Sequence, residues 1–207
     1  MSSTNEPEQY PVRPTPHCPN SVFPVLVYRG VLPTPVDEES TSDFLQRNHW
    51  EKKATTPNEK GTWGAITTKH FHPNTHECYG VIHGRSELVF GLGGADAVKA
   101  DADADDSNGE GEEGVRVTVA AGDVVVVPAG VAHASVRKDD GYRYIGVYPE
   151  GSPKWRNEWG KRELSGADDP LFDEIKGVRV PRCDPVFGAE GPLRRVWNGI
   201  LAEQPAE

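Results

Sequence analysis

The sequence predicts an all-β fold, a barrel or a sandwich, because short apolar runs alternate with turn residues along most of its length. The 207 residues include 22 glycines and 18 prolines, which imply many turns, and 36% of the residues are hydrophobic. A chain of this length is most simply one domain with an ample core. Strand-like segments that Gly and Pro interrupt at short intervals favour β-structure over helices.

The elements follow in order from the N-terminus. Residues 1–20 are expected to be an extended arm, since four prolines stand between positions 11 and 19. Residues 21–207 form the expected single domain, which begins with a strand at Phe23–Leu32. Asp37–Trp50 opens with acidic and hydroxyl side chains that can cap a helix, so a short helix is expected there. Asp169 followed by Pro170 predicts a second one.

The segment from Gly64 to Gly84 carries the most chemistry. Its spacing is Gly, five residues, His70, one residue, His72, four residues, Glu77, six residues, Gly. The residues before His70 favour a strand, and side chains two apart on a strand share a face, so both imidazoles can reach one ion. Pro73 and its neighbours indicate a turn, after which Glu77 opens the apolar run to Ile82.

A second segment complements the first. Gly122 is followed by the run Val124–Val127, which predicts a strand buried on both faces. Pro128 and Gly130 end that strand, and His133 starts the next one. The two segments together offer three imidazoles and one carboxylate, a common ligand set for a divalent transition metal. Without thiolate, the set suits Fe, Mn, Ni, Zn or Cu, one ion per chain.

These two segments resemble the paired motifs of the cupin superfamily, with Arg137 in place of the final Asn of the second motif. Longer stretches also resemble the YjlB-like cupins of bacteria and fungi, a family of largely undefined role. The stretches are FPVLVYRGVLP, HFHPNTHECYGVIHG, GDVVVVPAGVAH, GVYPEG and DPVFGAEGPL.

The resemblance implies a single cupin double-stranded β-helix, or jelly-roll, barrel with a few short helices. It implies a motif core at 64–137 and a C-terminal extension at 151–207. The acidic composition of residues 95–114 itself predicts a mobile insertion between two strands. The resemblance implies the metal ligands His70, His72, Glu77 and His133. Because cupins commonly pair through an N-terminal strand, it also points to a homodimer built on Phe23–Leu32. The competing interpretation is that this strand pairs within its own barrel.

Other residues near the motifs are weaker candidates. His76 suits acid–base catalysis or hydrogen-bonded support of a ligand, or else it bonds backbone groups of the turn. Tyr79 shares the face of Glu77 and can line a substrate pocket. Arg137 can anchor an anionic substrate group or face solvent. His83 lies too far along its strand to be a ligand.

Further aromatic residues leave their roles open. The alternating tyrosines of the strand 142–148 can line a cavity or pack in the core: Tyr142, Tyr144 and Tyr148. Trp155 and Trp159 follow the barrel and are expected to cover one end of it or a dimer contact.

The charge and composition of the chain argue against several classes of partner and location. Residues 96–113 hold eight acidic residues and one lysine, so most of the net charge of −10 lies in this segment. The rest of the chain has no basic patch with interleaved aromatics, which argues against nucleic acid. No apolar run has membrane-spanning length, and the N-terminus lacks the pattern of a signal peptide. Three cysteines then suggest reduced thiols in the cytoplasm.

Three functions remain open at this stage. The first is a metal-dependent enzyme acting on a small molecule, with dioxygenase chemistry or isomerase and decarboxylase-type chemistry as the classes considered. The second is a non-catalytic barrel that binds a small molecule or a metal. The third is a structural protein whose ion only ties strands together. A closed ligand shell or a fully packed barrel would favour this function.

Overall fold

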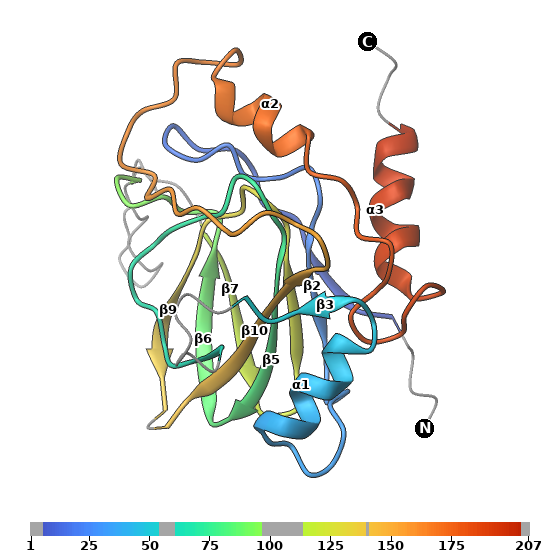
Figure 1. The fold of residues 1–207 in the computed structure, drawn as a ribbon. Helices are drawn as coiled ribbons and strands as arrows, with labels where there is room; N and C mark the ends of the chain where they lie inside the picture. The colour runs from blue at the N-terminus through green and yellow to red at the C-terminus, as the bar shows by residue number, and fades with distance from the viewer. Residues whose placement is uncertain (1–5, 54–60, 97–113, 140, 204–207) are drawn as a thin grey trace.

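A computed structural model describes residues 6–53, 61–96, 114–139 and 141–203 (Figure 1). The acidic insertion expected at 95–114 lies outside the described residues, except for its two ends. The elements are antiparallel strands and three short helices, so the chain is an all-β jelly-roll barrel as predicted. Among the described helices none is long and apolar enough to cross a membrane.

The strands form two sheets. The larger runs β1-β2-β8-β5-β10-β3, with β4 also paired to β10, and the smaller runs β7-β6-β9. The strands are β1 (Glu8–Tyr10), β2 (Val25–Tyr28), β3 (Trp50–Glu51), β4 (Thr62–Trp63), β5 (Glu77–His83), β6 (Arg85–Phe90), β7 (Val115–Ala120), β8 (Val124–Val127), β9 (His133–Lys138) and β10 (Arg143–Pro149).

The core lies on both sides of the larger sheet. Val125 and Val127 of β8 face inward, toward side chains of β6 and β7 in the smaller sheet. Val124 and Val126 face outward and pack with side chains of the helices. All four valines are buried, which confirms the expectation of a strand covered on both faces. Alternate residues of one strand thus belong to the barrel interior and to a helical outer layer.

Three helices complete the fold. The helix α1 (Glu38–Gln46) is capped by Asp37, and α2 (Pro170–Lys176) by Asp169 with Pro at its start, as the sequence indicated. A third helix, α3 (Pro192–Glu203), was not expected. Its Trp197 is buried in the outer core, stacks on Phe23 at 4.9 Å and donates from Nε1 to the Pro24 carbonyl at 3.2 Å. In Figure 1, α1 and α3 lie on the same side of the barrel.

The N-terminal segment is joined to the barrel from residue 8 onward. There β1 pairs with β2, and Cys18 and Asn20 are buried. On its other side β2 pairs with β8, so both edges of this strand are taken up within the chain. This arrangement matches the alternative in which Phe23–Leu32 pairs within its own barrel. The homodimer itself stays a prediction.

Candidate metal centre

Three histidines come together inside the barrel. Each offers a ring nitrogen, and these atoms lie within 4.8 Å of one another. His70 and His133 face each other across an isolated β-bridge: His70 N–H donates to the His133 carbonyl at 3.2 Å, and His133 N–H donates back at 2.9 Å. His72 lies two residues beyond His70, on the same face of an extended segment, as its spacing predicted. All three side chains are buried.

The backbone fixes which nitrogen each ring presents. Nδ1 of His70 donates to the Thr68 carbonyl at 2.9 Å, and Nδ1 of His133 donates to the Val131 carbonyl at 2.9 Å. Nδ1 of His72 donates to the Arg156 carbonyl at 3.1 Å. Because a carbonyl can only accept, Nδ1 carries the proton in each ring and Nε2 is left to bind. This tautomer is the one that histidine ligands of metals adopt.

Glu77, the first residue of β5, lies beside this cluster. Its Oε2 is 3.1 Å from Nε2 of His72 and 3.4 Å from Nε2 of His133. Two tyrosines hold the carboxylate: Tyr79 donates to Oε2 at 3.1 Å, and Tyr148 donates to Oε1 at 2.7 Å. The carboxylate therefore faces the histidines with Oε2 and the tyrosine of β10 with Oε1.

The protonation states of His70 and Glu77 suit metal ligands. Burial and the charge of His133 lower the pKa of His70 to about 3, so its ring is neutral. Burial alone would raise the pKa of Glu77, but the neighbouring His72 and His133 hold that pKa well below its ordinary range. Burial alone would lower the pKa of His72, but the negative charge of Glu77 outweighs burial and raises that pKa. At neutral pH the site therefore holds the ionised carboxylate of Glu77 near the neutral imidazole of His70.

The donor set fits a divalent transition metal. Nε2 of His133 is fully buried and has no hydrogen-bond partner among the described residues. A buried polar atom without a partner is costly, and an ion at the centre of the three rings would supply that partner. Nitrogen and carboxylate donors suit Fe, Mn, Ni, Zn or Cu. Cys78 contributes no thiolate, because it points into the outer core, as expected from its position on the strand.

A pocket of about 120 Å³ opens from the cluster. This is roughly ten times the ~10–15 Å³ that holds one water molecule. His70, His72 and Glu77 form its polar end, and most of the remaining wall is aromatic. The other lining residues are Trp63, Ile66, Tyr144, Tyr148, Trp155, Asn157 and Trp159. Tyr79 and His133 instead border a smaller hollow of about 10 Å³, also lined by Tyr144.

One segment of the C-terminal extension, the strap (residues 151–160), supplies much of the pocket wall. The Asn74 amide donates to the Lys154 carbonyl at 2.9 Å and accepts from Arg156 N–H at 3.0 Å. Phe71 and Glu158 exchange two backbone hydrogen bonds of 2.9 Å. The strap is therefore bound directly to the first motif. Trp155 and Trp159, expected to cover a barrel end or a dimer contact, line the pocket beside the histidines.

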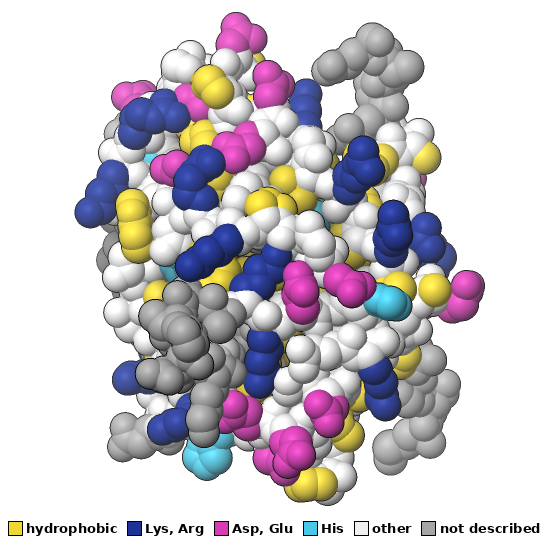
Figure 2. All heavy atoms as spheres, in the orientation of Figure 1, with side chains coloured by type: hydrophobic (Ala, Val, Ile, Leu, Met, Phe, Trp, Pro, Cys, Tyr) yellow, Lys and Arg dark blue, Asp and Glu magenta, His cyan; other side chains and the backbone are white. Residues whose placement is uncertain are grey.

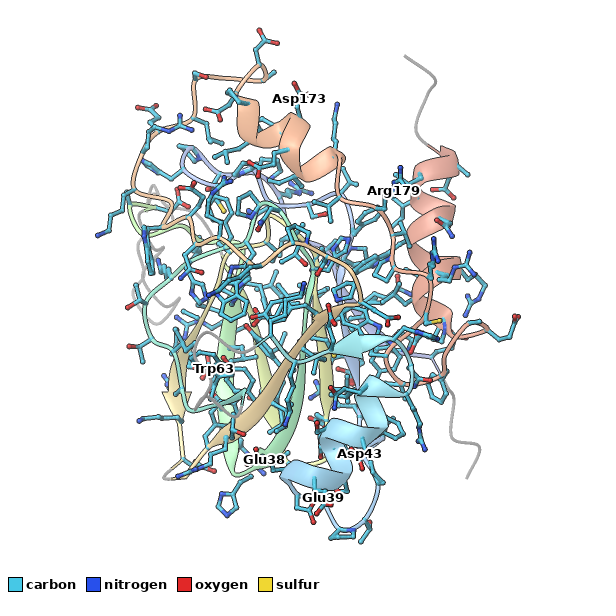
Figure 3. The ribbon with its side chains drawn as sticks, in the orientation of Figure 1. Glu38, Glu39, Asp43, Trp63, Asp173 and Arg179 are labelled. Carbon is cyan, nitrogen blue, oxygen red and sulfur yellow. The ribbon has the colours of Figure 1, made fainter. Side chains whose placement is uncertain are left out.

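Two predicted site residues lie elsewhere. His76 is buried on the outer side of the sheet, where its Nδ1 accepts from Ala129 N–H at 2.9 Å and its Nε2 donates to the Arg179 carbonyl at 3.2 Å. Figure 3 labels Arg179 in the segment between α2 and α3. Arg137 has a side chain 76% exposed and its Nε lies 3.7 Å from Glu87, so it lines neither pocket. The geometry matches the alternatives of a backbone-bonding His76 and a solvent-facing Arg137.

Sequence reasoning left Trp63 and Asn157 unnamed. Trp63 comes from β4 (Figure 3), directly before the first glycine of the motif. A Cβ on Gly146 would lie 3.2 Å from Trp63 Nε1 and 3.7 Å from Glu77 Oε1, so glycine at this point of β10 leaves room for both side chains. The position of Trp63 beside a motif was a usable signal, but Asn157 gave none.

Comparison with known proteins agrees with this geometry. Residues 60–142 match the cupin family model. The curated "Uncharacterized protein YjlB" of Bacillus subtilis (strain 168) is 25% identical over 177 residues, which are 84% of this chain and 86% of the relative. The barrel, the buried histidines and these matches make the chain similar to the cupins. The match over most of both chains makes it similar to YjlB in particular, as its sequence suggested.

Two solved structures show weaker similarity. A vicilin from Solanum melongena has a TM-score of 0.31 at 16% identity, covering 54% of this chain and 26% of the vicilin. A DUF861 family protein from Thermotoga maritima has a TM-score of 0.28 at 14% identity, covering 59% of this chain and 96% of that one. The chain thus spans about a quarter of the vicilin it matches, and similarity at this level carries no argument about function.

Proposed function

We propose that this cupin-like protein is a metal-dependent enzyme that acts on a small molecule. It binds one divalent transition metal ion through His70, His72, Glu77 and His133. The observation that carries the proposal is the set of three Nε2 atoms, each directed by an Nδ1–carbonyl bond, with His70 and His72 at the end of an open pocket.

Glu77 is the fourth ligand in this proposal. Its Oε2 is already the nearest carboxylate oxygen to two of the Nε2 atoms. Burial and the charge of Glu77 raise the pKa of Tyr148, so the Tyr148 hydroxyl keeps its proton and continues to donate to Oε1. Tyr148 therefore leaves Oε2 as the oxygen that faces the ion.

The chemistry follows from the setting of the site. When bound, the ion supplies a Lewis acid or a redox centre, which suits dioxygenase-like chemistry as well as isomerisation or decarboxylation. The residues around it orient the substrate and exclude water, because most of the pocket wall is aromatic. The pocket also argues against an ion that only ties strands together, since structural sites are closed by their ligands.

The proposal includes a setting in the cell. The three cysteines are free thiols, which supports a cytoplasmic protein. On the face in Figure 2, Lys and Arg side chains are interspersed with Asp and Glu, which supports the absence of a nucleic-acid partner.

We retain a homodimer in the proposal. Light scattering after size exclusion tests it, since a mass near 22.6 kDa would mean a monomer.

Metal analysis tests the ligand set. Protein purified from its own host should contain one transition metal ion per chain. In His72→Ala and His133→Ala, metal content should fall more than about tenfold, while the matched control His83→Ala keeps it. His83 is a suitable control because it lies at the far end of β5 from Glu77 and bonds only the Gly141 carbonyl in the described structure. Equal losses in all three variants would contradict the assignment.

Native mass spectrometry of the same protein tests the small-molecule part. A bound metabolite should leave when the metal is removed. Incubating the metal-loaded protein with that metabolite should then give a product of changed mass or an isomer separable by chromatography. A metabolite that binds and is returned unchanged, with and without dioxygen, would instead establish the non-catalytic binding protein.

A further inference from the structure

The walls of the pocket specify the shape of its ligand. Beyond the metal cluster, the pocket is bordered by three tryptophans, two tyrosines and an isoleucine, with Asn157 as the remaining polar side chain. No lysine or arginine is among the described residues that line it. A ligand therefore meets metal-binding groups at one end and ring faces or edges along its sides.

The aromatic wall is preformed. Trp155 stacks on Tyr148 with ring centroids 4.8 Å apart and planes 7° apart, and Trp63 meets Trp155 edge-on at 6.4 Å. The strap that carries Trp155 is fixed by the Asn74 amide on both sides of it. Rings that are already held in place lose little conformational entropy when a ligand binds.

The charge of the pocket argues against an organic cation as its ligand. Several aromatic rings near a carboxylate also describe a cage for an organic cation. Here the carboxylate of Glu77 already faces two histidines and accepts from two tyrosines. A divalent ion beside it would leave the end of the pocket positive, so the pocket favours a ligand whose polar end is neutral or anionic.

We propose that this pocket takes a small molecule with a single flat, unsaturated ring and one oxygen-bearing polar end, the ring lying against Trp155 and Trp63. The polar end faces His70 and His72. Size supports a single ring, because a pocket of about 120 Å³ leaves little room for fused rings or for a sugar chain. The inference rests on the proposed metal site and adds the class of its substrate.

A matched pair of acids tests the inference. Benzoate and cyclohexanecarboxylate carry the same polar end on six-membered rings, but only benzoate is flat. Calorimetric titration of the full chain, loaded with one zinc ion, should give a dissociation constant roughly tenfold lower for benzoate, the effect expected from one to two aromatic pairs. In Trp155→Leu this preference should fall at least about threefold, with zinc content unchanged.

Further variants keep the test decisive. Trp63→Leu repeats it from β4 if Trp155→Leu does not fold, and Phe187→Leu is the control, an aromatic residue that is 37% exposed and lines neither pocket. Equal affinity for the two acids, or an unchanged preference in the tryptophan variants, overturns the inference. So does tetramethylammonium binding more tightly than benzoate. A protein that holds zinc but fails these tests refutes the inference alone, whereas one that holds no metal refutes the proposed function and the inference with it.

Discussion

Replacing His76 by alanine should destabilise the fold and leave the metal site intact. The ring is fully buried between Phe23 and Trp197, with centroid distances of 6.3 and 4.8 Å. Its two nitrogens join the backbone of Ala129, next to the second motif, to that of Arg179, in the segment before α3. His76 thus ties the C-terminal extension to the sheet, on the face opposite to Glu77.

The expected loss can be built from these contacts. Alanine leaves the buried Ala129 N–H without a partner, which costs about 1–3 kcal/mol. It also removes the ring from a packed aromatic cluster, so a total of about 3–5 kcal/mol is expected. For a domain of this size, roughly 2–4 °C accompany each kcal/mol, so the melting temperature should fall by about 6–20 °C.

Calorimetry and metal analysis of the same samples provide the check. His76→Ala should melt early and still bind metal at low temperature, and His83→Ala should match the parent protein in both respects. A variant that melts normally but loses its metal would refute the reasoning, since it would place the action of His76 at the metal centre.

The same residue predicts a dependence on pH. Burial lowers the pKa of His76 from 6.5 to about 4, so the folded protein excludes a proton that the unfolded chain accepts. The stabilisation is fully present above pH 6.5 and is lost as the pH falls to 4, by up to about 3 kcal/mol. His76→Ala lacks this component, so its stability should decline less over that interval. Parallel declines would show that other groups govern acid stability.

Three further predictions concern other parts of the molecule. Tyr148→Phe removes the donor to Glu77 Oε1, so metal affinity should fall about 10–100-fold in competition with a chelator, and unchanged affinity would contradict the role given to that hydroxyl. Gly80→Ala places a Cβ 2.6 Å from a side chain of α1, so urea unfolding should show a loss of about 1–3 kcal/mol, and a neutral result would mean that α1 shifts freely. A thiol reagent should modify Cys183 first in the native protein, because burial raises the pKa of Cys18 to about 12, and early modification of Cys18 would contradict its burial.

The cluster of three histidines was predictable because most of its geometry follows from spacing within short segments of the sequence. The spacing of His70 and His72 defines a shared face, and the glycine and proline framework places His133 at the start of a strand that faces them. The same parity rule would have placed His76, since neighbouring residues on a strand point to opposite faces. Glu77 faces the barrel interior, and His76 therefore faces the helices.

The pocket wall was not predictable in the same way. Trp63, Tyr148 and Trp155 come from separate segments, and only the pairing of β4 and β5 with β10 and the path of the strap bring them together. The helix α3 was missed for a related reason. Its place depends on Trp197 packing on the sheet and on Asp184, whose Oδ2 accepts from Leu193 N–H at 3.0 Å. Such long-range contacts leave little trace in local sequence patterns.

One hydrogen bond connects the histidine cluster, which local spacing predicts, to the pocket wall, which long-range contacts form. Nδ1 of His72 donates to the carbonyl of Arg156, in the middle of the strap. The residue beside that carbonyl is Trp155, whose ring forms the pocket wall. The segment that shapes the pocket therefore also sets the tautomer and orientation of a histidine in the metal cluster. A change that moves the strap backbone at Arg156 is therefore expected to alter both the pocket wall and His72, so that ligand selectivity and metal affinity vary together. A side-chain change such as Trp155→Leu, which leaves the Arg156 carbonyl in place, is expected to alter selectivity alone.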